Sequence, residues 1–331
     1  ERCKNARFTI GSIATKPSKR SPAPPFTTST LQQEAARKIG FAVGTTMRVA
    51  QKLYEAGLIT YMRTDSMNLS DLCLNTVGPV ITELMGADYH QRRRYHTHAK
   101  GAQEAHEAIR PTDMRRSEIK GTAQEKRLYD LIWKRTVACQ MADAQLERTT
   151  VLIDVEGSEH HFVATGEVVK FEGFLRVYRE SFEDNENESA ENLAAEGLLP
   201  PMTEGQELHR QTITARQRYS LPPARYSEAS LVHKLEELGI GRPSTYAPTI
   251  STIQQREYVR RGENEGKPRP VTLVTLTGKD IVTEQSSENY GSDRGKLVPT
   301  DTGIVVNDFL MEKFPEIMDY NFTANVEHDF D

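Results

Sequence analysis

Apolar positions recur at a helical period in some segments of this chain and at a strand period in others, so the pattern predicts alternating blocks. Before residue 147 the helical period predicts helices over 29–40, 45–56, 70–86 and 122–142. Ser29 and Gln32 have the spacing of a capping box, and Gly40 and Gly57 stand where glycine commonly ends a helix. Between 58 and 62 the pattern predicts a short strand or an extended turn.

A strand period flanks this helical block on both sides. Residues 8–13 are predicted to be the centre of an extended segment, and four prolines within 16–25 exclude a helix and predict a linker there. After residue 146, strand-like runs bounded by turn residues are predicted over 150–155, 161–166, 173–178 and 208–216.

Helices return in the last third of the chain. The pattern there predicts a helix, a glycine turn, a helix, a strand and a helix, over 227–238, 239–243, 244–256, 271–276 and 302–313. The order helix, glycine turn, helix, strand therefore occurs twice, at 30–63 and at 228–260. Helix-turn-helix modules that bind nucleic acids often use this order.

These blocks predict an α+β multidomain fold. A β-rich domain is expected from residues 1–26 and 147–215, with a mainly helical domain, 27–146, inserted into it and carrying helix-turn-helix-like units. Part of a mixed, mainly helical domain is expected over 216–331. The length of 331 residues fits more than one domain, since domains average about 150 residues.

Composition excludes several classes of protein. No stretch approaches the ~18 uncharged apolar residues of a membrane helix, and the first residues have no apolar signal-peptide core, so we expect neither a membrane protein nor a secreted one. Cys3, Cys73 and Cys139 lie far apart, which excludes a disulfide scaffold and a cysteine-based zinc ribbon within this chain. Sparse thiols fit a reducing cytoplasm.

The net charge of −5 hides a strong asymmetry along the chain. Residues 1–70 carry eleven lysines and arginines against four acidic residues, whereas 180–207 carry nine acidic residues and no basic one. Local clustering sets the field that a polyanion experiences, so the balance of the whole chain does not exclude a polyanionic ligand. The acidic segment 180–196 is predicted to be a loose, solvated surface insertion.

Tyr61 and Arg63 form the most informative pair, with Thr64 and Asp65 directly after them. A tyrosine phenol, with an unperturbed pKa of about 10, is a poor nucleophile at neutral pH. A neighbouring guanidinium favours the phenolate and binds phosphate oxygens, so the pair suits part of a phosphodiester transesterification site. The alternative is that Tyr61 only packs in a short strand. Asp65 either orients Arg63 or caps the following turn.

Two further segments carry similar chemistry. Residues 106–113 bring a histidine, a glutamate, an arginine and an aspartate into one short stretch that begins at His106. The turn before the helix at 244–256 holds Arg242, Ser244 and Thr245, where free backbone N–H groups favour a phosphate. His96 and His98 imitate the paired histidines of metal-dependent tyrosine nickases, but their basic surroundings favour an exposed loop.

Three motifs in this order resemble type IA DNA topoisomerases: Tyr-Met-Arg-Thr-Asp-Ser at 61–66, His-Glu-Ala-Ile-Arg-Pro-Thr at 106–112 and Gly-Ile-Gly-Arg-Pro-Ser-Thr-Tyr-Ala at 239–247. Leu-Val-Pro-Thr at 297–300 and Asn-Asp-Phe-Leu at 307–310 match the same family, so the resemblance covers nearly the whole chain. The methionine between the tyrosine and the arginine is similar to bacterial topoisomerase I, whereas the topoisomerase III branch usually has proline there.

The resemblance implies an enzyme that binds single-stranded DNA, cuts one strand and joins Tyr61 to the 5′-phosphate. Another strand then passes through the gap before the cut is resealed, which relaxes negatively supercoiled DNA without ATP. Carried over by motif, Tyr61 is the nucleophile and Arg63 stabilises the scissile phosphate. The residues implied to contact DNA are His106, Arg242, Ser244, Thr245, Arg256, Thr64, Asp65, Gln51 and Tyr54.

The resemblance also implies parts that this sequence lacks. The Toprim domain, whose acidic residues bind Mg²⁺, and the zinc-ribbon tail are not present, so we expect a central fragment with no metal site of its own. Such a fragment holds the helical gate domain, the β-rich hinge domain and part of a DNA-binding domain. We expect a monomeric, cytoplasmic, nucleoid-associated bacterial protein that does not relax supercoils alone. The alternative is a single-stranded DNA-binding fragment without covalent chemistry.

Overall fold

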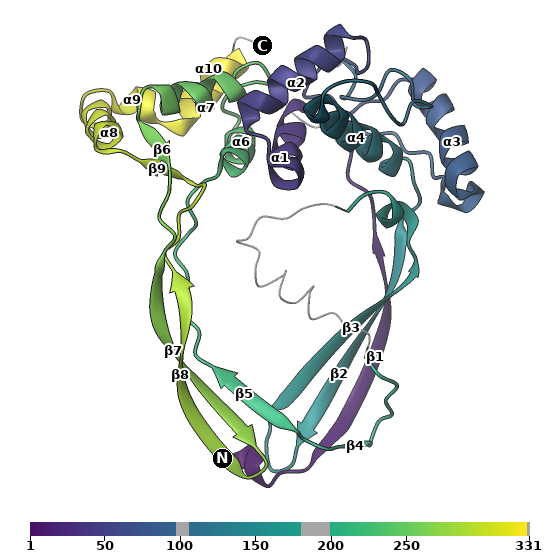
Figure 1. The fold of residues 1–331 in the computed structure, drawn as a ribbon, viewed down its shortest axis with the longest axis vertical. Coiled ribbons are helices and arrows are strands. Elements are labelled where there is room, and N and C mark those ends of the chain that lie inside the picture. Colours follow the sequence, from purple (N-terminus) through teal and green to yellow (C-terminus); the bar gives the residue numbers. More distant parts are fainter. Residues whose placement is uncertain (97–105, 180–198, 330–331) are drawn as a thin grey trace.

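Two long β arms descend from a layer of helices and meet at their far end, beside the N-terminus (Figure 1). This computed structural model describes residues 1–96, 106–179 and 199–329. The predicted α+β class is confirmed. The loop predicted at 96–98 lies partly, and the acidic insertion at 180–196 entirely, outside the described residues.

The helical body contains α1 (Thr28–Ile39), α2 (Val43–Glu55), α3 (Asp71–Met85) and α4 (Ala123–Ala138). These helices confirm the four predicted from the helical period, and Gly40 and Gly57 have the left-handed backbone that ends a helix. The side chains at the centre of its core are fully buried: Phe26, Leu31, Leu53, Ile59, Met62, Ile81, Ile109, Leu128 and Ile132. This core fixes the segment between α2 and α3 as firmly as the helices themselves.

The predicted capping box of α1 is wrong by two residues. The cap is Thr27, whose hydroxyl accepts from the N–H of Thr30, while the hydroxyl of Thr30 accepts from the N–H of Thr27. Ser29 instead donates to Glu236 of another helix. The prediction was wrong because the capping box is formed by two threonines, Thr27 and Thr30. The matching spacing of Ser29 and Gln32 is a coincidence.

The first arm is an antiparallel sheet of order β3-β2-β1-β4, built from β1 (Phe8–Arg20), β2 (Ala144–Val155), β3 (His161–Phe171) and β4 (Glu207–Leu208). β1 pairs with β2 from Phe8 opposite Val155 to Arg20 opposite Ala144. The linker predicted over 16–25 is therefore wrong up to Arg20. A proline is tolerated there because β4 covers β1 only at Phe8 and Thr9, leaving the rest of it an edge strand.

The strand predicted over 173–178 is also wrong. A 3₁₀ turn, Gly173–Arg176, bends the chain under the helical body, where Phe174 and Tyr178 are buried in its core. A Cβ at Gly173 would lie 2.4 Å from the carbonyl oxygen of Ala142, so only glycine permits this approach. The apolar residues of this run serve the helical core rather than one face of a sheet.

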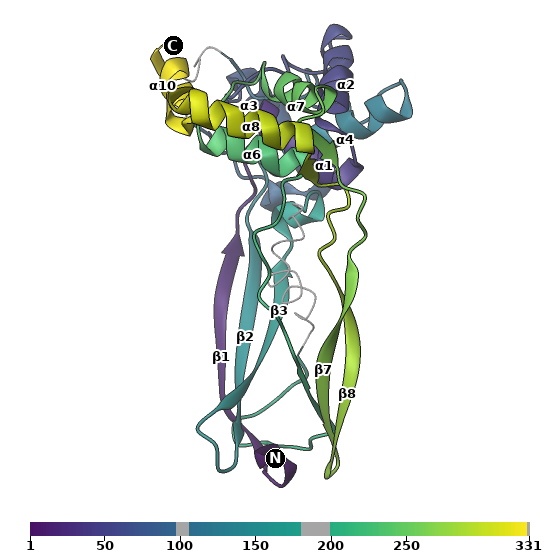
Figure 2. The same cartoon turned by 90° about the vertical axis from the view of Figure 1, so that its left-hand side faces the viewer.

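The second arm is a sheet of order β5-β7-β8, from β5 (Thr212–Arg216), β7 (Lys267–Thr277) and β8 (Asp280–Tyr290). The single strand predicted over 208–216 is thus two strands, β4 and β5, that belong to different sheets. Figure 2 shows the two arms apart, with β1 to β3 in one and β7 and β8 in the other. Between them, Arg210 donates to the carbonyls of Lys4 and Gly278, which joins the arms at their far end. β8 escapes sequence prediction because it is largely exposed and polar.

The last third of the chain returns to the helical layer with α6 (Glu228–Glu237) and α7 (Tyr246–Gln255), which confirm two further predicted helices. The short pair β6 (Val259–Arg261) and β9 (Leu297–Pro299) leads to α8 (Asp301–Lys313), α9 (Pro315–Met318) and α10 (Tyr320–Asp329). A second, small apolar cluster joins the two chain regions: Val43, Val232, Tyr246, Ala247 and Ile250. Short 3₁₀ turns also lie at Arg2–Lys4 and Ala87–Tyr89. Within the described ranges, no helix is long and apolar enough to cross a membrane.

The end of α7 stores a small amount of strain that a mutation can release. Glu257 has a φ of 54°, and the N–H of Tyr258 closes the helix end onto the carbonyl of Ile253 at 2.9 Å. We predict that Glu257→Gly stabilises the chain by about 0.5–1 kcal/mol, because glycine adopts this backbone without a Cβ clash. Thermal unfolding measures it, with Glu263→Gly as the control at an ordinary backbone position. An unchanged or lower midpoint for Glu257→Gly contradicts the prediction.

Candidate functional site

The segment that follows α2 exposes alternate side chains. Ile59 and Met62 are buried in the helical core, whereas Tyr61 is 39% exposed and Arg63 is exposed. Residues two apart in an extended segment point to the same side, so the phenol and the guanidinium share one surface. Arg63 has no hydrogen bond or ion pair with the described residues. Its charge is therefore available to a ligand.

A buried hydroxyl of α1 holds the segment on one side. Thr28, with no exposed surface, donates its hydroxyl to the carbonyl of Met62 at 2.8 Å and accepts the N–H of Thr64 at 2.8 Å. The N–H of Thr28 donates to the carbonyl of Thr64, also at 2.8 Å. Three hydrogen bonds to the residues flanking Arg63 leave this stretch little freedom to move.

The segment that begins at His106 holds the other side. The Thr60 hydroxyl donates to the carbonyl of Ala108 at 2.7 Å and accepts the N–H of Arg110 at 2.9 Å. The N–H of Thr60 donates to the carbonyl of Arg110 at 2.9 Å. The backbone on either side of Tyr61 is thus bonded to two different segments, which fixes where the phenol stands.

The second motif divides into structural and exposed residues. Arg110 is only 8% exposed and donates its Nε to Glu107 at 2.9 Å, its Nη1 to the carbonyl of Pro111 and its Nη2 to the Ser70 hydroxyl. This ion pair between buried Arg110 and half-buried Glu107 keeps the segment folded. His106 is exposed, and its ring centroid lies 6.5 Å from that of Tyr61.

Two exposed rings, those of Tyr54 and His106, lie beside the phenol of Tyr61. Tyr54, on the last turn of α2, meets Tyr61 edge to face with ring centroids 5.2 Å apart, and His106 lies on the same ring. Aromatic faces at the surface suit the stacking of unpaired nucleobases. Gln51, one turn earlier, donates its amide to Glu55 at 2.7 Å, so its described partner belongs to its own helix.

The other predicted residues lie in two places. The turn with Arg242, Ser244 and Thr245 precedes α7, where Thr245 accepts the N–H of Arg242 at 2.8 Å and Ser244 is exposed. The helix begins at Tyr246 rather than at the predicted residue 244, and no side chain caps it. The N–H groups of Thr245 and Tyr246 donate to the carbonyl of Arg242 at 2.8 and 3.2 Å, so the turn offers an anion its exposed Ser244 hydroxyl rather than a row of N–H groups. Arg256 stands at the other end of this ten-residue helix, about 15 Å away at 1.5 Å per residue.

Thr64 and Asp65 differ in their surroundings. Thr64 is buried and its hydroxyl accepts the N–H of Ser66 at 3.0 Å, so its side chain supports the loop. Asp65 is half-buried and makes neither an ion pair with Arg63 nor a cap, since the cap of α3 is Ser70. Direct DNA contact by either residue stays a prediction.

Sequence reasoning missed Thr28, Thr60 and the pairing of Glu107 with Arg110. The one local signal for these bonds was the run Thr27-Thr28-Ser29 at the start of α1. An N-cap needs only one hydroxyl, so the two further hydroxyls indicate other partners. It does not identify the partners, which lie 34 to 50 residues away along the chain.

No group of three or more histidine, cysteine, aspartate or glutamate side chains in the described ranges could hold a metal ion. The resemblance places the Mg²⁺ site in the Toprim domain, not among these residues.

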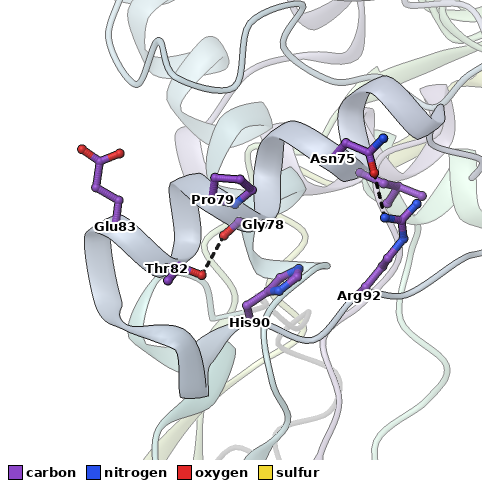
Figure 3. Close-up of a pocket in the computed structure, with 8 residues that line it drawn as sticks. Asn75, Gly78, Pro79, Thr82, Glu83, His90 and Arg92 are labelled. Atoms are coloured by element: carbon purple, nitrogen blue, oxygen red, sulfur yellow. Dashed lines mark hydrogen bonds between the residues drawn. The ribbon is translucent and has the colours of Figure 1, made fainter.

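A well-defined pocket lies elsewhere. A pocket of about 600 Å³ opens between α3 and the segment at His90, and Figure 3 shows the imidazole against Gly78. The Nε2 atom of His90 is buried without a partner, and burial, with the nearby Arg92, lowers the pKa of this imidazole. None of the predicted site residues lines this pocket.

Comparisons with known proteins agree with this geometry. The profile of a family described as DNA topoisomerase matches residues 1–284. A mimivirus protein named DNA topoisomerase 1 type prokaryotic is 44% identical over all of this chain, which spans 40% of it. DNA topoisomerase 1 of Zymomonas mobilis is 43% identical over 99% of this chain, which spans 24% of that protein.

The fold has a close counterpart among solved structures. Full-length topoisomerase I from Thermotoga maritima matches 98% of this chain with a TM-score of 0.71 and 31% identity, and the chain spans 48% of it. Fold and motifs together thus define a DNA topoisomerase. The chain belongs to that family, in the branch of bacterial DNA topoisomerase I.

The role of Thr28 can be tested directly. Thr28→Val keeps the shape but leaves the carbonyl of Met62 and the N–H of Thr64 without their partner, so we predict a loss of about 1–3 kcal/mol of stability. Amide hydrogen exchange at Thr64 should accelerate. Thr76→Val is the matched control, because that hydroxyl bonds only within its own helix. Equal effects of the two substitutions would show that Thr28 does not hold the loop.

Proposed function

We propose that this chain cuts and reseals one strand of DNA through a covalent bond between Tyr61 and a 5′-phosphate, and so takes part in relaxing negative supercoils. The observation that carries the proposal is the exposed Tyr61 next to Arg63, which has no ion pair among the described residues, on a loop held from two sides. Membership of the DNA topoisomerase family supports it.

The step balances with few groups. The phenolic oxygen of Tyr61 forms a bond to phosphorus while the bond from phosphorus to the 3′ oxygen breaks. The phenolic proton passes to water or a base, and the 3′ oxygen takes up a proton. Arg63 stabilises the negative charge that develops on the phosphate oxygens, which is the main requirement of phosphoryl transfer. Reversal of the step reseals the strand.

We assign the binding of a single strand to two groups of residues. Tyr54 and His106 offer rings for stacking beside Tyr61, and the turn with Arg242, Ser244 and Thr245 offers a guanidinium and hydroxyl groups to a backbone phosphate. Arg256, Gln51, Thr64 and Asp65 complete the proposed contacts. The excess of basic residues in 1–70 makes this binding dependent on salt.

The wider assignments rest on the family. We propose that residues 27–146 act as the gate, 1–26 with 147–215 as the hinge and 216–331 as part of the DNA-binding region, in a monomer of the bacterial cytoplasm that acts at the nucleoid. A Toprim domain outside these 331 residues would supply Mg²⁺, because the described residues offer no metal site. A second candidate is a single-stranded DNA-binding function without covalent chemistry, which the exposed rings of Tyr54 and His106 also suit.

A cleavage assay separates the two candidates. With 3′-labelled single-stranded DNA and Mg²⁺, we predict a protein–DNA adduct on a denaturing gel only when a Toprim domain is supplied separately. The chain alone should not relax supercoiled plasmid. DNA binding without any adduct would favour the binding function, and relaxation by the chain alone would refute the need for the added domain.

Tyr61→Phe tests the identity of the nucleophile. We predict that this substitution abolishes the adduct and leaves the thermal unfolding midpoint nearly unchanged, since the phenolic oxygen is at the surface. Tyr219→Phe, at another exposed tyrosine, is the control and should form the adduct normally. If Tyr61→Phe retains the adduct, another residue, of which Tyr54 is the nearest phenol, is the nucleophile.

A further inference from the structure

Helix α6 makes hydrogen bonds to the helical body at both of its ends. At its first residue, Glu228 accepts the backbone N–H of Val43 at 2.9 Å. In its last turn, Glu236 accepts the hydroxyl of Ser29 at 2.6 Å. These bonds join residues 185 and 207 positions apart in the sequence, and Figure 1 shows α6 beside α1.

Glu228 supplies the cap that α2 lacks. The residue at the N-cap position of α2 is Ala42, whose side chain cannot accept a hydrogen bond. A carboxylate at a helix N-terminus satisfies a free N–H and interacts favourably with the helix dipole. Gln254 at 3.1 Å and Arg261 at 2.6 Å hold the same carboxylate in place.

The pKa of Glu228 reflects this network. Burial by itself raises the pKa of the carboxyl, but the hydrogen bonds from Val43, Gln254 and Arg261 outweigh burial and bring it below its ordinary value. The group is therefore charged at neutral pH while it bridges α2, α7 and β6.

Glu236 meets the nucleophile segment through α1. Its partner Ser29 is adjacent to Thr28, which holds the backbone on both sides of Arg63. Glu236 itself precedes the turn with Arg242 by only a few residues. One short path of bonded residues thus links the phosphate-binding turn to the loop of Tyr61.

Apolar contact alone does not set the angle at which α6 packs against α1 and α2. Five buried residues form the small cluster between α2 and the pair α6 and α7. Apolar contact is non-directional, whereas hydrogen bonds specify both distance and direction. The two carboxylates are therefore the groups that determine how α6 lies against α1 and α2.

We propose that Glu228 and Glu236 are positioning residues that clamp α6 to the helical body and hold the Arg242–Thr245 turn in register with Tyr61. A single DNA strand can then contact both at once. This inference rests on the proposed function, because it assumes that the two parts bind the same strand. Neither carboxylate contacts the DNA itself.

Alanine substitutions measure the clamp. Glu228→Ala and Glu236→Ala should each weaken the binding of a fluorescein-labelled single-stranded oligonucleotide about five- to tenfold, the size of a modest coupling between sites. Removing a negative charge would otherwise strengthen binding to DNA, so the sign of the change is diagnostic. Glu237→Ala is the matched control, because Glu237 pairs only with Lys234 of its own helix. It should bind as tightly as the unchanged chain, or slightly more tightly.

A disulfide tests whether the alanine variants lose DNA binding because α6 and α7 are displaced from the helical body. A Cβ at Gly44 would lie 3.8 Å from the hydroxyl of Ser251, so Gly44→Cys with Ser251→Cys can link α2 to α7. In the Glu228→Ala background, the oxidised pair should restore binding and reduction should remove it again. A general folding defect would not be rescued by this single link.

The results of these experiments distinguish failure of the clamp from failure of the proposed DNA-binding function. Unchanged binding in both alanine variants, or a loss that the disulfide does not restore, overturns the clamp. If the unchanged chain binds no single-stranded DNA, the proposed function fails instead. The clamp is then judged without DNA, by the rate at which the cysteines at positions 44 and 251 form their disulfide. Glu228→Ala should slow that rate severalfold, and an equal rate overturns the clamp.

Discussion

The first turn of α1 is the point at which the parts of this molecule are joined. Thr28 bonds the backbone around Arg63, and its neighbour Ser29 bonds α6 on the other side. Buried polar groups are strongly destabilising when unpaired, so these hydroxyls tie the position of the loop of Tyr61 to the stability of the fold itself. The loop of Tyr61 can be rigid without belonging to a helix or a strand, because both of its edges are bonded to buried backbone.

The path of the chain explains how a helical body comes to carry this loop. β1 leaves the first arm at Arg20 and β2 re-enters it at Ala144, where the two strands pair directly. Everything between them is inserted at one end of a sheet, which keeps the site away from the arms (Figure 1). The second arm returns the chain to the same helical layer, where α6 and α7 pack on α1 and α2. The Thermotoga topoisomerase I structure matches 98% of the chain with a TM-score of 0.71, so the fold is shared with that protein.

Local signals predicted the helices well, and the failures have a common cause. Glycine at positions 40 and 57 ends helices by its own backbone preference, so those ends needed no tertiary information. The run at 173–178 was misassigned because its apolar residues pack into a distant helical core. β8 was missed because its polar sequence lacks the apolar alternation of a strand, and its strand conformation depends on pairing with β7. Among the site residues, the motifs identified Tyr61 and Arg63, whereas Thr28 and Thr60 carry no motif of their own.

The sequence by itself determined the family, the helix ends at the two glycines and the candidate chemistry of Tyr61, Arg63 and His106, because these depend on residue types at short spacing. Only the tertiary structure decided which groups hold them. The partners of Thr28, Glu228 and Glu236 lie 34 to 207 residues away, and a single hydrogen bond across such a distance leaves no pattern in one sequence. The buried pairing of Glu107 with Arg110 likewise separates structural residues from exposed ones inside a single motif. Burial, which spacing alone does not report, makes that distinction.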